Sequence, residues 1–472
     1  MTVNQKYDAI IIGSSRATIF LSQALAQAGQ RTALIEREYL GGTCINVGCT
    51  PTKTMVASAR VAYLAHRAAD YGVHTGPVTV NLAEVKQRKD GLVEMLRNFP
   101  QGLIEQTEGL DFIMGEASFT APKSVQVQLN DGRVTHLTAD TIIIATGGRP
   151  AVPPVPGLDK VPILNSSSVM ELDTLPEHLL VLGGGYIGLE FGQMFRRFGS
   201  QVTIVELGKQ LLNLEDPDVA EAVAKILRED GIEILLEANT LQAEQTEAGQ
   251  VQLAIKTLEG ERMLTGSHLL VAASRVPNTD RLNLEAAGVQ TDERGFIRVT
   301  ERLETNVPGI YALGDVKGGP AFTHIAFDDF RILRTNLVMG GKATTTGRLV
   351  PYTVFIDPQL GRVGLTETEA RTRGQNIRVA KLPMNYMGPT RAREVDETRG
   401  FMKVVVDADT HQILGAAILG LDGGEIMTVL EVAMMGNLPY TAIRDGVFAH
   451  PTLAESLNDL FMMMDMQMPE ES

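Results

Sequence analysis

The sequence has no tryptophan and only two cysteines, Cys44 and Cys49, among its 472 residues. A chain of this length can bury a core without disulfide bonds, so two cysteines so close together indicate chemistry more than scaffolding. Proteins that depend on disulfides in oxidising compartments carry many more cysteines. The composition therefore excludes a small disulfide-stapled domain.

Long apolar runs, a signal peptide and an excess of positive charge are also missing. Apolar runs such as "DTIIIATGG" and "HLLVLGGG" are far too short to cross a bilayer. The opening residues "MTVNQKYDAIIIG" lack the regions of a signal peptide. The net charge of −15 argues against binding to nucleic acid or to an anionic membrane. We therefore expect a cytoplasmic protein with neither of these partners.

Two segments share one pattern, which predicts two nucleotide-binding folds. Both "YDAIIIGSSRATIFLSQALAQAGQRTALIERE" and "HLLVLGGGYIGLEFGQMFRRFGSQVTIVELGK" read as strand, tight turn, helix, glycine, strand and acid. The second has the complete motif, with Gly183 for the turn, Gly185 for approach to a pyrophosphate and Gly188 for helix packing. In this frame, the acid that ends the second strand is suited to bind ribose hydroxyls.

The first copy of the pattern is degraded. Gly13 remains, but Ser15 and Thr18 stand where the second copy has its later glycines. Ser15 adds a side chain where the backbone approaches the pyrophosphate, and Thr18 puts a β-branched group at a close helix contact. Arg16 and the hydroxyls of Ser14, Ser15 and Thr18 offer phosphate contacts in return. We predict that the segment is an altered nucleotide turn that still works; the alternative is a strand–turn–helix that merely resembles one.

Turn and linker segments elsewhere in the sequence predict that one nucleotide domain is inserted into the other. A proline-rich linker at 150–156 follows the strand "TADTIIIATGG", and "LLVAASRVPNTD" repeats that strand-then-turn arrangement. After about residue 346 the pattern changes to that of a separate α+β domain. We predict an α/β fold with two Rossmann-like, three-layer domains, one of residues 1–150 and 271–345 and one of residues 151–270, followed by an α+β domain of 346–472.

The stretch "GGTCINVGCTPTK" contains both cysteines. In a regular helix, residues five apart have Cα atoms roughly 8.6 Å apart, beyond the usual disulfide limit of about 7 Å. Gly48 and Pro51 favour a distorted start to a helix, in which a strained and readily reduced disulfide can form. Lys53 follows Cys49 by four residues and would favour its thiolate. Two buried free thiols are the alternative.

Several motifs together resemble one enzyme family. "GGTCINVGCTPTK", "GGGYIGLEFG", "ATGGRP", "ALGDV" and "HPTLAES" resemble the FAD-dependent pyridine nucleotide–disulfide oxidoreductases, which include glutathione reductase, dihydrolipoamide dehydrogenase and mercuric reductase. The likeness covers nearly the whole chain, and the motifs occur in family order. It implies FAD in 1–150 with 271–345, NAD(P)H in 151–270, and an obligate homodimer formed through 346–472.

The resemblance also implies the roles of the dithiol residues. Cys49 would lie against the flavin and Cys44 would meet the substrate, while Lys53 would pair with Glu190 near the flavin. Hydride would pass from NAD(P)H through FAD to the Cys44–Cys49 disulfide. The Cys44 thiolate would then attack an oxidised small-molecule substrate, as in enzymes of the EC 1.8.1 or 1.16.1 type.

The acid–base group implied by the resemblance is His450, supported by Glu455 and supplied by the other subunit. A histidine is suited to move a thiol proton near neutral pH. Two sets of cofactor contacts complete the prediction. The residues expected to contact FAD are Gly13, Ser15, Arg16, Glu36, Gly42, Thr43, Lys53, Gly115, Ala117, Ala145, Thr146, Gly147, Arg275, Asp315, Thr323 and His324. The residues expected to contact NAD(P)H are Gly183, Gly185, Tyr186, Ile187, Gly188, Glu206 and Ser274.

The choice between NADH and NADPH depends on Glu206. Its carboxylate is suited to accept the 2′-hydroxyl of NADH and to repel a 2′-phosphate. Lys209, three residues on, weakens that exclusion slightly. We therefore expect NADH to be preferred and NADPH to be tolerated.

The substrate is inferred within the family. With no third cysteine, the C-terminal cysteine relays of mercuric and thioredoxin reductases are absent. "PAFTHIAFDDFRIL", "TRAREVDETRGFMKVVVDA" and "HPTLAESLNDLF" most resemble the reactive-chlorine-resistance, mercuric-reductase-like flavoproteins, which implies hypothiocyanous acid or a similar oxidant. The alternatives are dihydrolipoamide dehydrogenase, a mercuric or other metal-ion reductase, and a non-catalytic redox sensor or flavin-poor relic.

The last residues, "FMMMDMQMPEES", contain five methionines. Thioethers can bind Cu(I), but such runs more often pack at an interface or fray at a terminus. We predict packing or fraying here, and no metal site.

Overall fold

The computed structural model describes residues 4–466, which form two units, each assembled from separate stretches of the chain. Unit 1 contains the described residues up to Thr54 together with 84–152 and 274–348. Unit 2 contains 55–83, 153–273 and the described residues from Leu349 onward. The predicted domain boundaries divide the chain more finely than these units and stay predictions. None of the described helices is long and apolar enough to cross a membrane.

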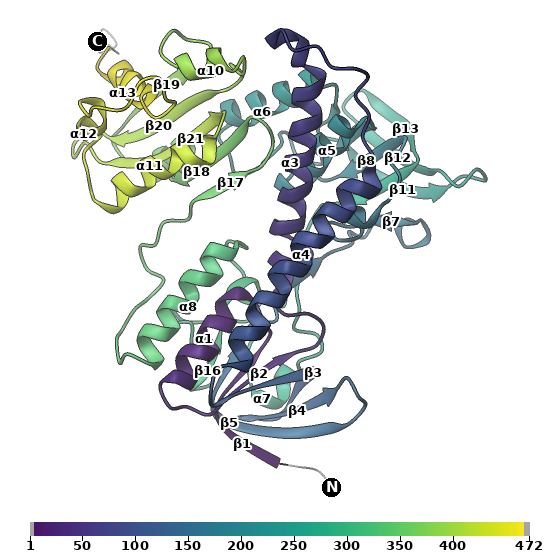
Figure 1. Ribbon diagram of the computed structural model, residues 1–472, viewed down its shortest axis with the longest axis vertical. Coiled ribbons are helices and arrows are strands. Elements are labelled where there is room, and N and C mark those ends of the chain that lie inside the picture. The colour runs from purple at the N-terminus through teal and green to yellow at the C-terminus, as the bar shows by residue number, and fades with distance from the viewer. Residues whose placement is uncertain (1–3, 467–472) are drawn as a thin grey trace. The chain divides into compact units, whose positions relative to one another are not determined.

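Unit 1 is built on a sheet with a different layer on each face (Figure 1). The parallel strands lie in the order β3 (Leu110–Ala121), β2 (Thr32–Glu36), β1 (Asn4–Ile12), β5 (Val134–Ile144) and β16 (Ile310–Ala312). Strand β4 (Ser124–Leu129) pairs antiparallel with β3 and β5. Helices α1 (Arg16–Gln27) and α8 (Thr323–Leu337) lie side by side over one face (Figure 1).

Strand β1 explains why this sheet is buried on both faces. Ala9 and Ile11 pack into the core beneath α1 and α8, whereas Ile10 and Ile12 pack into the core on the β3–β4–β5 side. Successive side chains of a strand point to opposite faces, so a strand covered on both sides needs an uninterrupted apolar run. The short helix α7 (Leu284–Ala287) packs on β3 within the second of these layers.

Unit 2 contains a second parallel sheet. Its order is β10 (Glu233–Leu235), β9 (Gln201–Val205), β8 (His178–Leu182), β14 (His268–Val271) and β7 (Ile163–Leu164). Helices α5 (Tyr186–Phe198) and α6 (Pro217–Glu229) belong to this fold, as does an antiparallel sheet of β11 (Asn239–Gln245), β12 (Val251–Thr257) and β13 (Gly260–Gly266). The second copy of the repeat therefore forms the same strand–turn–helix–strand unit as the first.

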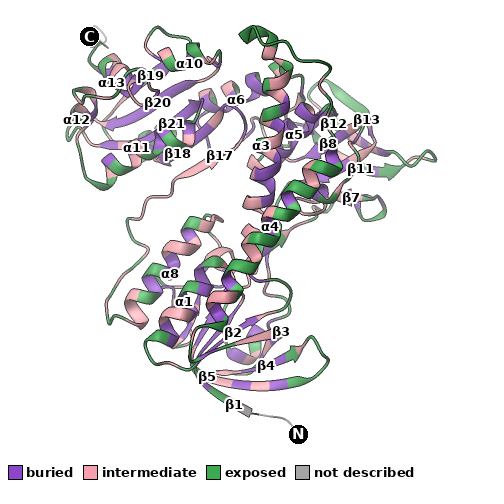
Figure 2. Ribbon diagram, viewed as in Figure 1, coloured by how far each residue is buried: buried purple, intermediate pink, exposed green. Residues whose placement is uncertain are grey.

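The last part of unit 2 is an antiparallel sheet with helices. The strand order is β17 (Tyr352–Val354), β18 (Gln359–Gly364), β21 (Ile413–Gly420), β20 (Phe401–Asp407) and β19 (Ile377–Pro383). Helix α11 (Gly423–Met435) packs on β18 and β21, and α13 (Ser456–Met466) packs on β19. Other short elements are α9 (Glu367–Thr372), α10 (Thr390–Glu394) and α12 (Tyr440–Arg444), and in unit 1 α2 (Gly42–Asn46), β6 (Gly148–Pro150) and β15 (Arg275–Pro277). Figure 2 shows strands such as β18, β20 and β21 mostly buried, whereas helices such as α8 and α11 carry exposed residues.

The methionine-rich end of the chain is partly built into this core. Met464 is fully buried among the helices and strands of the antiparallel sheet, whereas Met462 and Met466 are exposed. Met464 therefore packs in the core of this unit, and packing of the methionines at an interface stays a prediction. The rest of the tail, from residue 467 on, lies outside the described residues.

The degraded first turn and the complete second turn have the same backbone shape. Gly13 and Gly183 have φ angles of +105° and +116°, a region that favours glycine. Ser15 and Gly185, which cap α1 and α5, are both extended, with φ/ψ of −67°/165° and −80°/173°. A Cβ atom at Gly185 would meet no other atom within 4 Å. A serine therefore fits at this position of the turn without backbone strain.

Thr18 replaces the third glycine by making a hydrogen bond. In the second turn, a Cβ atom at Gly188 would lie 2.1 Å from the carbonyl oxygen of Gly183, so only glycine fits there. In the first turn, the Thr18 hydroxyl donates to the corresponding carbonyl, that of Gly13, over 2.7 Å. The Thr18 backbone N–H also donates to Ser15 Oγ over 3.4 Å, which caps the helix. The substitution thus exchanges close packing for a polar contact.

Replacing Thr18 by valine tests this exchange. Thr18→Val keeps the shape of the side chain but removes the donor to the partly buried Gly13 carbonyl, so we expect a loss of about 1–3 kcal/mol in the free energy of unfolding. Ser22→Ala is the matched control, because the buried Ser22 hydroxyl donates to Ile19 in the same helix, whose carbonyl keeps its helical partner. Urea unfolding followed by circular dichroism measures both. Equal losses in the two variants would contradict the account.

Candidate active site

The acid at the end of β2 is held rigidly against the first turn. Glu36 Oε2 accepts hydrogen bonds from the backbone N–H and the hydroxyl of Ser14, at 3.0 and 2.6 Å. Glu36 Oε1 accepts from the backbone N–H groups of Arg37 and Glu38, at 2.8 and 3.0 Å. The Ser14 hydroxyl, expected from the sequence to offer a phosphate contact, thus orients the acid instead. A carboxylate fixed at this point is suited to receive ribose hydroxyls.

The same arrangement occurs in the second turn. Glu206 Oε2 accepts from the backbone N–H of Gly184 over 2.5 Å, and Glu206 Oε1 accepts from that of Gly208 over 2.6 Å. Gly184 occupies the position in this turn that Ser14 occupies in the first. Each acid therefore binds the residue that follows the first glycine, and the internal repeat extends to this hydrogen bond.

Residues 40–42 pack directly on the first turn and lead into the dithiol segment. The backbone N–H of Gly41 donates to the Ser14 carbonyl over 2.8 Å, and Gly42 has φ of +62°. A Cβ atom at Gly42 would approach the Ser15 Cα to 3.2 Å, so a larger residue would push on the turn. Helix α2 begins at Gly42 and carries Thr43 and Cys44. The nucleotide turn and the first cysteine are thus held by one continuous stretch.

Arg16 makes a different contact from the phosphate contact expected of it. Its guanidinium carbon lies 4.9 Å from the centre of the Phe327 ring on α8, a cation–π distance. The hydroxyls of Ser15 and Thr18 are 3.2 Å apart and hydrogen-bond to each other. Contacts from these side chains to a phosphate stay a prediction. The N–H groups of the first turn of α1 remain the general anion-binding feature of this site.

The other predicted FAD contacts in unit 1 lie within β3, beside the ends of other strands and at the start of α8. A Cβ atom at Gly13 would lie 2.4 Å from the carbonyl oxygen of Ala145, so the residue after β5 packs closely on the first turn. Thr146 exchanges hydrogen bonds with Asn278, a residue that the sequence did not single out. Gly115 and Ala117 lie on β3, Gly147 precedes β6, Arg275 begins β15, Asp315 lies in the turn after β16, and Thr323 and His324 begin α8.

The two cysteines lie in successive helices. Cys44 is in α2, Cys49 is the first residue of α3 (Cys49–His66), and both carry free thiols. Gly48 lies between the helices, and a Cβ atom there would lie 2.8 Å from the Thr43 carbonyl oxygen. This close approach brings the start of α3 back toward Cys44. The sequence predicted such a break before the helix, and the structure explains why glycine is needed.

The two thiols differ in acidity. The hydrogen bond from the Cys44 thiol is the main cause that lowers the pKa of Cys49, an exposed residue, to about 6. The Thr323 hydroxyl, 3.5 Å from Cys49 Sγ, and the charge of Lys53 lower it further. The hydrogen bond to Cys49 raises the pKa of Cys44, and burial adds to the rise. Cys49 therefore carries the negative charge, and Cys44 keeps the proton.

His450 and Glu455 form a pair in unit 2. Nδ1 of His450 lies 2.8 Å from Glu455 Oε2, and the imidazole side chain is 65% exposed. A carboxylate at Nδ1 orients the ring and leaves Nε2 to exchange a proton with another group. This geometry is suited to the acid–base role predicted for His450. The single chain leaves its action across a dimer as a prediction.

Glu190 and Lys53, predicted to pair, belong to different units. Glu190 is buried in α5, and its Oε1 accepts from the backbone N–H of Phe355 over 2.9 Å within unit 2. Lys53 belongs to unit 1, on the first turns of α3. Their pairing stays a prediction.

The residues predicted to contact NAD(P)H gather at the turn between β8 and α5, with one exception. A Cβ atom at Gly183 would lie 2.7 Å from the carbonyl oxygen of Ala272, so the end of β14 packs on this turn. Tyr186 and Ile187 begin α5. Ser274 belongs to unit 1, so unit 2 alone does not bring it to the others.

Two family models match this sequence. The model of the pyridine nucleotide-disulphide oxidoreductases matches residues 7–329, and that of their dimerisation domain matches residues 350–461. The chain belongs to the pyridine nucleotide-disulphide oxidoreductases. It is therefore an oxidoreductase of a family that uses FAD and NAD(P)H, and the predicted fold of two Rossmann-like domains and a C-terminal dimerisation domain is confirmed.

The curated relatives of this oxidoreductase differ in their named activities. The chain is 41% identical to the probable pyridine nucleotide-disulfide oxidoreductase RclA of Escherichia coli (strain K12), with 97% of this chain and 99% of the relative covered. It is 35% identical to a mercuric reductase of Staphylococcus aureus, covering 96% of this chain and 81% of the relative. It is 33% identical to a dihydrolipoyl dehydrogenase of Chlamydia trachomatis, covering 96% of each.

Solved structures agree with these relatives. The HOCl-induced flavoprotein disulfide reductase RclA from Escherichia coli is similar to this oxidoreductase with a TM-score of 0.87 and 40% identity, covering 97% of this chain and 100% of that one. A Cu(II) complex of the same protein has a TM-score of 0.88 at 40% identity, covering 97% and 99%. The predicted likeness to reactive-chlorine-resistance flavoproteins is confirmed by these matches.

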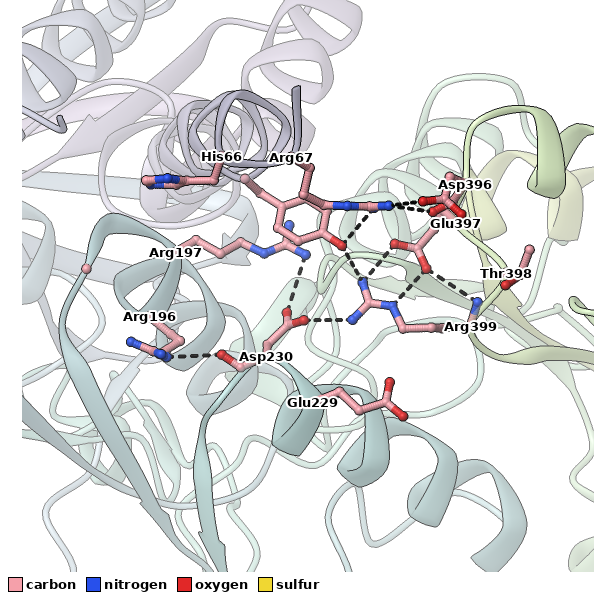
Figure 3. A pocket seen from close by; sticks show the side chains of 12 residues that line it. His66, Arg67, Arg196, Arg197, Glu229, Asp230, Asp396, Glu397, Thr398 and Arg399 are labelled. Carbon is pink, nitrogen blue, oxygen red and sulfur yellow. Dashed lines mark hydrogen bonds and ion pairs between the residues drawn. The ribbon is translucent and has the colours of Figure 1, made fainter. Parts of the chain in front are cut away.

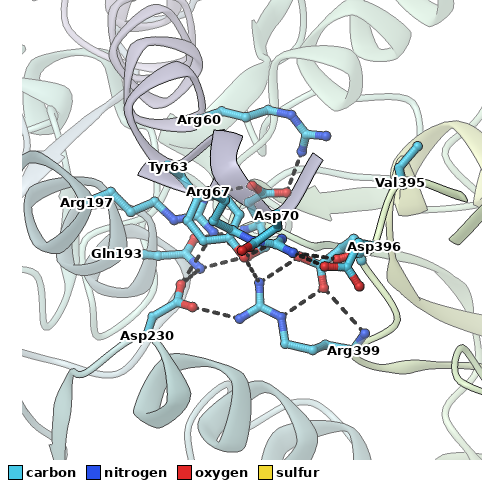
Figure 4. A network of polar contacts seen from close by, with 12 residues as sticks. Arg60, Tyr63, Arg67, Asp70, Gln193, Arg197, Asp230, Val395, Asp396 and Arg399 are labelled. Carbon is cyan, nitrogen blue, oxygen red and sulfur yellow. Dashed lines mark hydrogen bonds and ion pairs between the residues drawn. The ribbon is translucent and has the colours of Figure 1, made fainter. Parts of the chain in front are cut away.

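A cavity of about 600 Å³ in unit 2 is lined by none of the predicted site residues (Figure 3). Its walls are dominated by paired charges. The Tyr63 hydroxyl accepts hydrogen bonds from Arg67 and Arg399, at 3.0 and 3.2 Å, and the Arg197 guanidinium carbon lies 3.9 Å from the centre of the Tyr63 ring (Figure 4). Asp230 accepts from Arg399 over 2.6 Å. Since these arginines already face carboxylates, we assign the cavity no ligand.

The pH dependence of Cys49 alkylation tests the asymmetry of the dithiol. Because the pKa of Cys49 is lowered to about 6, its thiolate predominates above pH 6 and is lost as the pH falls below it. Thr323→Val removes a donor to the thiolate, so we expect the midpoint for iodoacetamide modification of Cys49 to rise by about 1 pH unit. Peptide mass mapping of the reduced protein separates Cys49 from Cys44.

The control for this experiment is Thr32→Val, which removes a buried hydroxyl of unit 1 that donates to the Gln30 carbonyl and not to a cysteine. We expect its midpoint to stay unchanged. Faster modification of Cys44 than of Cys49 at pH 7 would contradict the assignment of the charge.

Proposed function

We propose that this oxidoreductase takes hydride from NADH by way of FAD, reduces its Cys44–Cys49 disulfide, and uses the dithiol to reduce hypothiocyanous acid or a similar small oxidant. The observation that carries the proposal is the placement of Cys44 and Cys49 in the successive helices α2 and α3, with the Thr323 hydroxyl 3.5 Å from Cys49 Sγ. A charged Cys49 beside a protonated Cys44 is the product expected when a disulfide is reduced from the Cys49 side.

The residues of unit 1 fit FAD. The backbone of the first turn matches that of the glycine-rich second turn, and Ser15 occupies a position where a side chain has room. The N-terminus of α1 would hold the pyrophosphate, and the fixed carboxylate of Glu36 would hold ribose hydroxyls. Asp315 would add a carboxylate from the turn after β16. Bound there, FAD supplies a two-electron carrier between the nicotinamide and the disulfide.

The protein's own groups handle the protons. Reduction of the disulfide by two electrons with uptake of one proton gives the Cys49 thiolate and the Cys44 thiol. Because the pKa of Cys44 is raised, this thiol needs a base before it can attack. His450 would accept its proton at Nε2, while Glu455 at Nδ1 stabilises the imidazolium.

The chemistry of the substrate then follows from two thiols in sequence. The Cys44 thiolate attacks the sulfur of hypothiocyanous acid, forming a bond to Cys44 as the hydroxyl leaves and takes a proton to become water. The Cys49 thiolate attacks Cys44, which re-forms the disulfide and releases thiocyanate. Each turnover therefore consumes one NADH for each oxidant reduced.

Metal-ion reduction is a second candidate. The similar Escherichia coli flavoprotein is known as a Cu(II) complex, and mercuric reductases are among the relatives. With two cysteines in all, this chain has no second pair to pass metal inward, so a metal ion would meet Cys44 and Cys49 directly. Dihydrolipoamide reduction remains the alternative supported by the dihydrolipoyl dehydrogenase relatives.

The proposal includes the organisation of the whole protein. Residues 1–150 with 271–345 would hold FAD, residues 151–270 would hold NAD(P)H, and residues 346–472 would form a homodimer in the cytoplasm. The dimerisation-domain match supports the homodimer. His450 would reach the dithiol of the other subunit.

Turnover by cysteine variants tests the proposal. Cys44→Ser and Cys49→Ser should each lower kcat for NADH-dependent reduction of hypothiocyanous acid by at least about 1000-fold, because each removes one sulfur of the disulfide. The FAD content of both purified variants should equal that of the unaltered protein. The same assay with lipoamide, glutathione disulfide, Cu(II) and Hg(II) separates the alternatives. Retained turnover in either variant would refute the dithiol mechanism.

The nucleotide preference is tested at Glu206. Its carboxylate, held by Gly184 and Gly208, would oppose a 2′-phosphate, so Glu206→Gln should shift the ratio of kcat/KM for NADH over NADPH by about tenfold toward NADPH. Glu237→Gln, a change of the same kind in the same domain, is the control and should leave the ratio unchanged. A wild-type enzyme that prefers NADPH would contradict the assignment.

A further inference from the structure

Asp329 is the buried carboxylate of unit 1 that the mechanism leaves without a role. It lies on α8, seven residues into the helix, and its exposed fraction is 0%. A carboxylate withdrawn from water is costly unless cations and hydrogen bonds surround it. Asp329 has such partners on both of its oxygens. They come from the turn of residues 314–317 and from the end of unit 1.

Asp329 contacts both ends of this turn. Oδ2 accepts from the backbone N–H of Gly314 over 2.9 Å and lies 3.3 Å from Lys317 Nζ. Oδ1 accepts from Arg348 over 2.6 Å. The turn between Gly314 and Lys317 carries Asp315, so one carboxylate fixes the residues on either side of it.

Lys317, the cation that pairs with Asp329, also influences the neighbouring acid Asp315. The Lys317 side chain is 7% exposed and its ammonium pairs with Asp329. The charge of Lys317 also acts to lower the pKa of Asp315. Arg275 reaches Asp315 Oδ2 at 3.7 Å while it donates to the Gly148 carbonyl over 2.7 Å. The pKa of Asp315 is raised, mainly by burial and also by the charge of Asp329, while the charges of Arg275 and Lys317 oppose the rise.

We propose that Asp329 is a positioning residue of the flavin site: it holds the turn that presents Asp315 to the hydroxyl groups of FAD. The proposal rests on the proposed function, because it takes Asp315 as a FAD contact. Helix α8 then serves the site twice, since its first residue, Thr323, also lies beside the Cys49 thiol.

The test measures FAD affinity in the full-length holoprotein, from the rise in flavin fluorescence as FAD dissociates on dilution. Asp329→Asn keeps an acceptor of the same shape but loses the charge that holds Gly314 and Lys317. We expect the Kd for FAD to rise about 10- to 100-fold, as for loss of a charged hydrogen bond. An unchanged Kd would overturn the proposal.

Asp328→Asn is the matched control. Asp328 is the neighbouring residue on α8 and shares Arg348, at 3.5 Å, but has no bond to Gly314 or Lys317. Its Kd for FAD should stay within about twofold of the unaltered protein. A loss equal to that of Asp329→Asn would assign the effect to the ion pairs with Arg348 and overturn the proposal.

A double-mutant cycle separates positioning from a merely structural role. Asp315→Asn should weaken FAD binding by itself, and adding Asp329→Asn should then weaken it by no more than about twofold, because the residue being positioned is gone. The same factor in both backgrounds would mean that Asp329 acts through general stability, and would overturn the proposal.

If Asp329→Asn fails to fold, the variant carrying Lys317→Gln with Asp329→Asn removes both members of the ion pair and leaves neither charge buried alone. It should still bind FAD about tenfold more weakly, since Gly314 has lost its charged acceptor. Unchanged binding by this variant would overturn the proposal. A wild-type protein that binds no FAD would contradict the proposed function instead, so the two failures can be told apart.

Discussion

The proposed chemistry depends on one interaction, the hydrogen bond between the thiols of Cys44 and Cys49. It leaves the charge on Cys49 and the hydrogen on Cys44, so the two sulfurs have different chemistry although they are five residues apart. Gly48 allows the close return of the chain that brings the sulfurs together, and Thr323 supplies a hydroxyl beside the charged one. The asymmetry is therefore a product of the fold and not of either cysteine alone.

The turn that would bind FAD keeps the backbone shape of the glycine motif although two of the glycines are replaced. Its residues Ser15 and Thr18 differ from the glycines of the second copy for two separate physical reasons. The first position is extended and open, so it never required glycine. The second position is crowded, and there a hydroxyl bonds to the carbonyl that a glycine would otherwise have to approach. The glycine motif is therefore one way to build this turn, and the first copy shows a second way.

The sequence predicted the parts of this protein whose pattern is local. Strand–turn–helix repeats, the glycine of the tight turn and the break between the cysteines depend on residues within a few positions of one another, and the structure agrees. Partners distant in the sequence left no such pattern. The bond from Ser14 to Glu36 and the burial of Asp329 depend on which strands and helices meet, as does the pairing of Tyr63 with Arg399.

The site as a whole divides in the same way. The cysteine segment and the two acids at strand ends could be found from spacing, whereas the roles of His450 and Glu190 came from the resemblance to a family. A histidine followed by proline has no spacing of its own that indicates catalysis. The resemblance also implied its support by Glu455, and the structure has His450 Nδ1 2.8 Å from Glu455 Oε2.

The most direct test of the central claim is the visible spectrum of the purified protein during anaerobic titration with NADH. The account predicts flavin absorbance bands at the start, and then a long-wavelength absorbance typical of a thiolate in contact with a flavin as Cys49 becomes charged. That result would support the altered turn, the cofactor and the role of Cys49 together. A colourless protein that gains no flavin bands on addition of FAD would contradict it.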